Sequence, residues 1–257
     1  MNWIPISTTK HRDKALKRDR DYNFAKSITL VPVHLEDLFI SVAHMPLVFY
    51  QINEVTEMVA VLGLENGQNL FVGDDGSWPI DFVPAVFRCH PFSAVDMENG
   101  ESTLAFREDS DLIVDRSHGD PLFNVDGSES QVFKSLAALA VAIKKQRVFL
   151  RAACSLLSEF ELLQPLSLKF QKEDGAVLQL GNVYGINKNK LNELEGKKFT
   201  KLRETSAIDV VYAHLFSLNS FSILLQIMNA RQKITSNLNG LGLEIFADKE
   251  AKMDFSF

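Results

Sequence analysis

A long helical pattern in residues 131–160 limits the possible folds more than any other feature of this sequence. Ser128 and Gln131 have the spacing of a capping box at the start of this pattern, and Pro165 follows its end. The pattern predicts one long helix or two stacked helices, with apolar residues recurring at the spacing of one helix face. These residues are Phe133, Leu136, Leu139, Ala140, Ile143, Phe149, Ala153, Leu156, Leu157 and Phe160.

The sequence before this helix is typical of strands and turns. Residues 47–52 and 58–64 are rich in β-forming side chains and predict a hairpin joined by residues 53–57. Residues 33–43 predict an amphipathic helix, because their apolar positions have helical spacing and their acidic residues lie near the start. The region before residue 30 predicts an irregular lead-in with a short strand.

The sequence after the long helix contains one more hairpin signal and two helical patterns. Residues 166–170 and 176–180 flank Asp174-Gly175, which is a common hairpin turn. Residues 187–203 predict a charged helix with a break at Gly196, and residues 208–231 predict another long helix.

The strand signals and the helix signals therefore occupy different parts of the chain. A strand-rich region covers residues 1–125, and a helix-rich region with one β-hairpin covers residues 126–257. Segregated elements favour an α+β fold with antiparallel strands over a doubly wound sheet. We expect the two regions to form one continuous domain, 1–257.

The charge balance argues against binding of duplex nucleic acid. The chain has 27 basic and 33 acidic residues, for a net charge of −6, whereas phosphate binding requires clustered Lys and Arg. The basic run in residues 10–20 is interrupted by Asp13 and Asp19. It is either a solvated segment or a contact for an acidic partner surface.

The apolar runs and the two ends of the sequence indicate the cellular compartment of the protein. No run reaches the length of a transmembrane helix, and the start lacks the apolar core of a secretory signal. Cys89 and Cys154 have no metal-site spacing and fit a reducing compartment. We therefore expect a cytoplasmic protein. The alternative is export without a cleaved N-terminal signal, for which the only support is the acidic, aromatic tail at residues 253–257.

Residues 78–92 combine three prolines with large apolar side chains. This spacing predicts rigid extended chain or edge strands rather than helix. Such a segment suits partner binding because little conformational entropy is lost on association. The alternative is that the rings fill the interior of a small β-structure. The candidate partner-binding residues are Asn69, Trp78, Phe82, Arg88, His90 and Phe92.

One possible metal-ligand pattern is present. His118 and Asp120 form an HxD triplet and His214 lies downstream, which is the type of ligand set used by non-haem iron oxygenases. The competing interpretation is that Asp120 belongs to a turn before Pro121 and that His214 is a hydrogen-bonded core residue. Phosphate-loop, dinucleotide-binding, nucleophile-elbow and HExxH motifs are absent from the sequence, and no cofactor is expected.

Several stretches together, in order and over nearly the whole chain, resemble the SapC family. In the first half these are His11 with Tyr22, Phe24 and Ala25; residues 45–49; residues 61–64 and 68–72; Trp78 with residues 82–85; and Arg88 with residues 91–92. In the second half they are residues 119–123 with 126–127; residues 174–175; residues 185–187 with 190–191; and residues 212–215 with 217–218.

The resemblance implies a link to bacterial surface layers and their secretion, and it supplies no catalytic mechanism. Together with the missing catalytic motifs, it favours a non-catalytic binding or assembly factor with a protein partner. The alternative is a metal-dependent oxygenase or hydrolase that acts on a peptide or sugar. A structural subunit that is itself exported is a further possibility.

Overall fold

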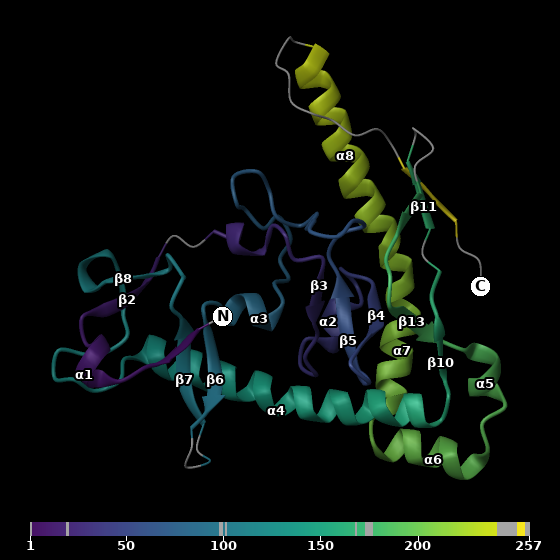
Figure 1. The fold of residues 1–257 in the computed structure, drawn as a ribbon, viewed down its shortest axis with the longest axis horizontal. Coiled ribbons are helices and arrows are strands. Elements are labelled where there is room, and N and C mark those ends of the chain that lie inside the picture. The colour runs from purple at the N-terminus through teal and green to yellow at the C-terminus, as the bar shows by residue number, and fades with distance from the viewer. Residues whose placement is uncertain are drawn as a thin grey trace. The chain divides into compact units, whose positions relative to one another are not determined.

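A computed structural model describes residues 2–18, 21–97, 100, 102–167, 169–172, 177–240 and 251–254. The chain forms two compact units, each built from two separate segments. Unit 1 contains Met1–Tyr22 and Val83–Val148, and unit 2 contains Asn23–Phe82 and Phe149–Phe257. Both units therefore draw residues from the strand-rich region and from the helix-rich region (Figure 1).

Unit 1 contains small antiparallel sheets and the first part of a long helix, α4. One sheet has the order β1-β7-β6 and another the order β8-β2-β9. The elements of this unit are β1 (Trp3–Pro5), α1 (Thr8–His11), β2 (Lys14–Lys17), α3 (Ala85–Cys89), β6 (Phe92–Asp96), β7 (Ser102–Arg107), β8 (Ile113–Asp115), η2 (Arg116–His118), β9 (Gly119–Pro121) and the start of α4 (Gln131–Glu159).

The core of unit 1 lies between these strands and α4. Phe92 on β6 pairs with Phe106 on β7, and Phe123 packs against Phe133 of α4 with ring centroids 5.3 Å apart. Burial of such side chains away from water is the main stabilising contribution here. The buried cluster consists of Ile6, Leu16, Cys89, Phe92, Leu104, Phe106, Leu112, Leu122, Phe123, Phe133, Leu136 and Ala140.

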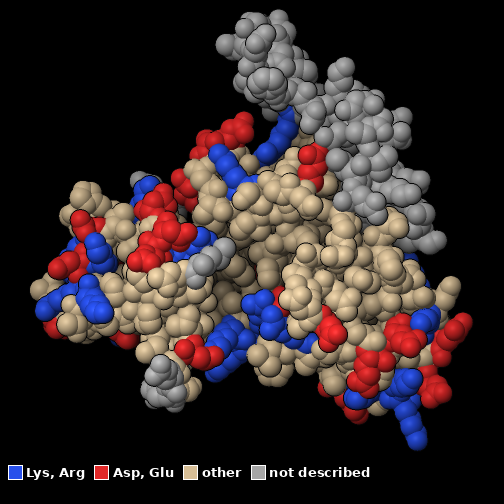
Figure 2. Space-filling model, viewed as in Figure 1, with Lys and Arg blue, Asp and Glu red and all other residues tan. Residues whose placement is uncertain are grey.

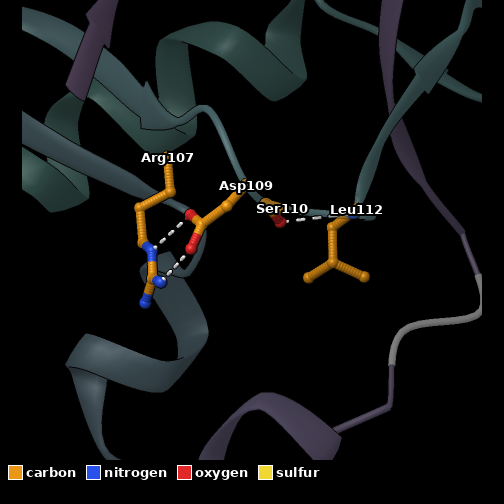
Figure 3. Close-up of polar contacts among 4 residues, drawn as sticks. All are labelled: Arg107, Asp109, Ser110 and Leu112. Carbon is orange, nitrogen blue, oxygen red and sulfur yellow. Dashed lines mark hydrogen bonds and ion pairs between the residues drawn. The ribbon is translucent and has the colours of Figure 1, made fainter. Parts of the chain in front are cut away.

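The turn between β7 and β8 is held by local polar contacts (Figure 3). Arg107 donates to both carboxylate oxygens of Asp109, with Nε–Oδ1 at 3.0 Å and Nη2–Oδ2 at 2.6 Å. The Leu112 N–H donates to Oγ of Ser110 at 3.2 Å. The pairing with Arg107 lowers the pKa of the exposed Asp109 carboxyl. The Asp109 carboxylate therefore stabilises an exposed turn through its ion pair with Arg107.

Unit 2 is built around a five-stranded antiparallel sheet with the order β10-β13-β4-β5-β3, and a second sheet has the order β12-β11-β14. Its elements are η1 (Asn23–Ala25), β3 (Leu30–Pro32), α2 (Leu38–Ser41), β4 (Leu47–Ile52), β5 (Val55–Val61), the end of α4, β10 (Leu163–Pro165), β11 (Lys169–Lys172), β12 (Val177–Gln179), β13 (Val183–Ile186), α5 (Lys188–Asn192), α6 (Gly196–Glu204), α7 (Ala207–Ser217), η3 (Leu218–Ser220), α8 (Phe221–Gly240) and β14 (Ala251–Asp254).

The β4–β5 hairpin forms the centre of the large sheet. Leu47, Val48 and Phe49 are fully buried, and so are most residues of β5. A two-residue turn joins the strands, and both its residues, Asn53 and Glu54, have positive φ. Paired left-handed residues match the right-handed twist of a hairpin. Helix α7 runs beside β13 and β4 (Figure 1).

The structure confirms the α+β prediction, with antiparallel sheets towards the N-terminus and a long helix, α4, in the second half. The predicted β-hairpins are also present, as β4–β5 and β11–β12. Of the tail at residues 253–257 that suggested export, Met253 and Asp254 belong to β14 (Ala251–Asp254), which pairs with β11; residues 255–257 lie outside the described residues.

Three local predictions were wrong. The helix predicted for residues 33–43 is confined to Leu38–Ser41, because the Val33 N–H instead donates to the Met58 carbonyl beside the sheet. A short helix, α3, lies within the proline-rich segment. Pro84 is at its N-cap, and the backbone N–H that proline lacks is not used at the start of a helix. Ser130 rather than Ser128 caps α4, since its Oγ accepts from the Phe133 N–H at 3.1 Å.

Candidate functional site

His214 of α7 joins two strands at the point where their own pairing stops. The β4–β13 register ends with Phe49 opposite Tyr184, and continuing it would set Leu47 opposite Ile186. Here Nδ1 of His214 donates to the Leu47 carbonyl at 2.7 Å, and Nε2 accepts from the Ile186 N–H at 3.2 Å. The imidazole thus replaces direct hydrogen bonding between the strands.

Two neighbouring residues complete this junction. The Leu47 N–H donates to Oγ of Ser217 at 2.8 Å, so both backbone groups of Leu47 are bonded to α7 side chains. On the β13 side, Gly185 leaves room for the imidazole, because a Cβ there would lie 3.1 Å from Nε2 of His214. A cavity of about 600 Å³ opens beside this junction, and its polar lining comes from Gln164, Ser167, Asn187, Lys188 and Asn189.

These contacts set the protonation state of His214. Burial lowers its pKa to about 4, although the hydrogen bond to Leu47 partly opposes the shift. The ring is therefore neutral at pH 7, with its proton on Nδ1. Each ring nitrogen is already used within the fold, so neither has a lone pair for a metal ion.

The other two members of the candidate metal set also have local partners. His118 is exposed, with Nδ1 3.0 Å from Oγ of Ser117, and Asp120 accepts from Nε of Arg18 at 2.9 Å. His118 and Asp120 belong to unit 1, whereas His214 belongs to unit 2. Across the described part of the chain, no group of three or more His, Cys, Asp or Glu residues is arranged to hold a metal ion.

The cysteines are packed inside the units. Cys89 lies in the core of unit 1, and Cys154 is fully buried on α4. Burial raises the pKa of both thiols to about 12. Both side chains therefore behave as small apolar residues and not as nucleophiles.

The candidate partner-binding residues have different exposures. Asn69, Phe82 and Phe92 are buried at 3%, 8% and 4% exposure, so they present no surface to a partner. Trp78 and His90 are half-buried and Arg88 is exposed. Trp78 and Phe82 belong to unit 2, and Arg88, His90 and Phe92 belong to unit 1.

Asn69 and Trp78 have local structural roles. Nδ2 of Asn69 donates to the Ala25 carbonyl at 3.1 Å, and its Oδ1 accepts from the Phe71 N–H at 2.9 Å. Nε1 of Trp78 donates to the Phe82 carbonyl at 2.8 Å. For Phe82 and Phe92, these positions match the alternative that the rings fill the interior, and the bonds of Asn69 match the role of a residue that holds a turn. The partner-binding prediction now depends on Arg88 and on the accessible parts of Trp78 and His90.

An apolar groove is formed within unit 2 by α4, α6 and α7; we call it the α4–α6–α7 groove. It has a volume of about 670 Å³, within the range typical of ligand pockets. Small residues on α4 leave it open, while larger buried ones form its floor. It is lined by Leu35, Phe149, Leu150, Ala152, Ala153, Ser155, Leu156, Glu159, Lys201, Glu204, Thr205, Ser206 and Val210.

Phe149 is a large aromatic residue of the groove that is 68% exposed to solvent. The sequence pattern had placed Phe149 on the packed face of the long helix. The sequence itself argues against that placement. Val148, Phe149 and Leu150 are three consecutive apolar residues, which cannot all point to one side of a helix. Leu150 is buried at 4% exposure, and Val148 and Phe149 are exposed.

One helical stretch in the described residues, Ala207–Arg231, is long and apolar enough to cross a membrane by length and composition. The apolar runs of the sequence predicted no segment of this length. Its inner face packs within unit 2 through residues such as Val210, Val211 and Phe221. The core helix of a globular protein can satisfy the same criterion.

A family model described as SapC matches residues 6–224. The chain belongs to the SapC family. Comparison with curated proteins and with solved structures gave no match. The segments that carry the SapC resemblance include Leu47, Gly185, Ile186, His214 and Ser217, which meet at the junction described above. In this SapC protein, those segments are linked by direct hydrogen bonds and close packing.

Proposed function

We propose that this SapC protein is a non-catalytic binding or assembly factor that holds a partner protein connected with bacterial surface layers or secretion. We further propose that it acts in the cytoplasm. Family membership supports the proposed context. Binding is supported by the α4–α6–α7 groove, which offers apolar surface within one compact unit.

The observation that carries the proposal is the exposed ring of Phe149 at this groove. A large aromatic side chain at an apolar concavity is typical of the anchor residues that contribute most to protein–protein affinity. The groove floor includes Leu150, Leu156 and Val210, which are nearly inaccessible to water. A single apolar segment of a partner would therefore both cover the Phe149 ring and fill the groove.

The groups that would be needed for the enzymatic alternative are engaged in structural contacts. Both ring nitrogens of His214 hold backbone groups, and Asp120 accepts from Nε of Arg18. These contacts favour binding over a metal-dependent oxygenase or hydrolase that uses His118, Asp120 and His214.

Site-specific photo-crosslinking tests the proposal. A photoreactive phenylalanine analogue would replace Phe149 in the full chain, and crosslinked products from the source cells would be identified by mass spectrometry. The matched control carries the analogue at Val125, which is 81% exposed and lies in unit 1. We expect a surface or secreted protein to be crosslinked from position 149 and not from position 125. The same products from both positions, or none from position 149, would contradict the proposal.

A further inference from the structure

The solvent-facing side of α7 carries exposed aromatic rings, and it continues into an uncharged surface at the start of α8, where Asn219, Ser222 and Gln226 are exposed. The stretch Ala207–Arg231 has 25 residues, and 44% of its most apolar part is buried. Tyr212 and Phe216 are 47% and 64% exposed, and their rings stack at 6.1 Å. Half-buried apolar residues extend this surface, namely Ile208, Leu215, Ile223 and Ile227. Residues 210–230 include no Asp, Glu, Lys or Arg.

The opposite side of the same stretch is attached to the sheet. His214 and Ser217 hold the backbone of Leu47, and Phe221 and Leu224 are fully buried. Pulling this helix across a bilayer would break those bonds and expose the core of unit 2. The geometry therefore suits a helix that lies on a membrane surface with one face in the interface. Figure 2 shows few charged residues on the visible middle of unit 2, whereas Lys, Arg, Asp and Glu gather at its lower edge, around α5 and α6.

A basic segment lies directly before this helix and packs beside it. Residues 188–203 contain six basic and two acidic residues, a local charge of +4 in a chain whose net charge is −6. Lys188 lines the same cavity as Leu215, and Lys201 of α6 lines the same groove as Val210 of α7. Phe199 of α6 is 41% exposed. A cationic segment beside exposed aromatic and aliphatic side chains is the pattern of interfacial lipid binding.

We propose that the outer face of α7 and the start of α8, together with the basic segment 188–203, docks on an anionic lipid bilayer. The apolar face enters the headgroup region, and the Lys and Arg side chains contact lipid phosphates. A second copy of this chain is a poorer occupant, because a symmetric dimer through this face would bring two basic segments together. Tyr212 and Phe216 do not line the α4–α6–α7 groove, although Lys201 of the basic segment does. The lipid contact therefore rests on side chains other than Phe149, and it is tested separately from the groove.

Vesicle flotation of the full chain tests this proposal. The probes are vesicles of phosphatidylcholine alone and of phosphatidylcholine mixed with phosphatidylglycerol. We expect binding to the mixed vesicles to be roughly tenfold or more tighter, and to weaken as salt is added. The variant Tyr212→Ser with Phe216→Ser should lose binding. The variant Lys197→Gln with Arg203→Gln should weaken it roughly tenfold for mixed vesicles only.

Val125→Ser is the matched control, since Val125 is an exposed apolar residue of unit 1, and it should bind like the wild type. Circular dichroism and the unfolding midpoint show whether each variant is folded. The proposal is overturned if mixed vesicles do not bind the protein, or if the Tyr212 and Phe216 changes leave binding intact. Light scattering without lipid provides a further test, because a dimer that these two changes dissociate would mean that the face binds a second copy instead.

Discussion

Gly185 and His214 approach so closely that a Cβ on residue 185 would lie 3.1 Å from Nε2 of the imidazole. The imidazole cannot easily move away, because its nitrogens are bonded to Leu47 and Ile186. Gly185 therefore permits a side chain of α7 to join two strands of the sheet. The same Cβ would also lie 3.3 Å from Cδ1 of Leu166, on the neighbouring side of the cavity.

Gly185→Ala should destabilise the protein by about 1–3 kcal/mol, as expected for overpacking against a fixed neighbour. The free energy of unfolding in urea measures this effect. Gly181→Ala is the matched control, because a Cβ at residue 181 would meet nothing within 4 Å. If both variants were equally stable, the close packing of Gly185 on His214 would have no energetic consequence.

His214→Phe should cost about 2–5 kcal/mol, because the buried Ile186 N–H would lose its partner and the Leu47 carbonyl would keep only the longer bond from Oγ of Ser217, at 3.4 Å. The same urea measurement checks this value. His118→Ala provides the comparison, since His118 is exposed and contacts only its neighbour Ser117 among the hydrogen bonds described. We expect its effect to stay within about 0.5 kcal/mol. A similar loss in both variants would argue against the bridging role of His214.

Acid should destabilise the protein through His214. In the unfolded chain this residue binds a proton near its ordinary pKa of 6.5, whereas burial lowers the pKa to about 4 in the folded state. Between these values the unfolded state binds more protons, so stability falls as the pH falls. The full effect, below pH 4, is about 3 kcal/mol.

Other titrating groups also respond to acid, so the comparison should be made as a difference between wild type and His214→Asn. The stability difference between them should be largest at pH 7 and should shrink as the pH approaches 4.5. A difference that is constant with pH would show that the pKa of His214 is not depressed in the folded state.

Cys89 and Cys154 should be unreactive in the folded protein. With their pKa values raised to about 12, the thiolate fraction at pH 8 is on the order of one in ten thousand. Thiol titration with a disulfide reagent should detect little reaction until denaturant is added, and then two thiols per chain. Rapid modification of the folded protein would mean that one of the cysteines is accessible.

Local sequence patterns were sufficient for the hairpin β4–β5, for the α+β class and for a helical region at residues 131–160, which they left open as one helix or two and which is the single helix α4. Helical periodicity and turn residues act over a few positions, so they can be read without the rest of the fold. The same patterns failed for α2, where the Val33 N–H is taken by Met58, and for Phe149, whose exposure depends on which helices pack beside α4.

The junction at His214 depended on tertiary structure. His214 lies 167 positions from Leu47 and 28 from Ile186 along the chain, and no local periodicity connects them. Sequence alone left His214 open as a metal ligand or a core histidine, because the choice depends on whether both ring nitrogens find partners. Folding brings α7 against the ends of β4 and β13, and the buried backbone groups of those strands then bond both nitrogens.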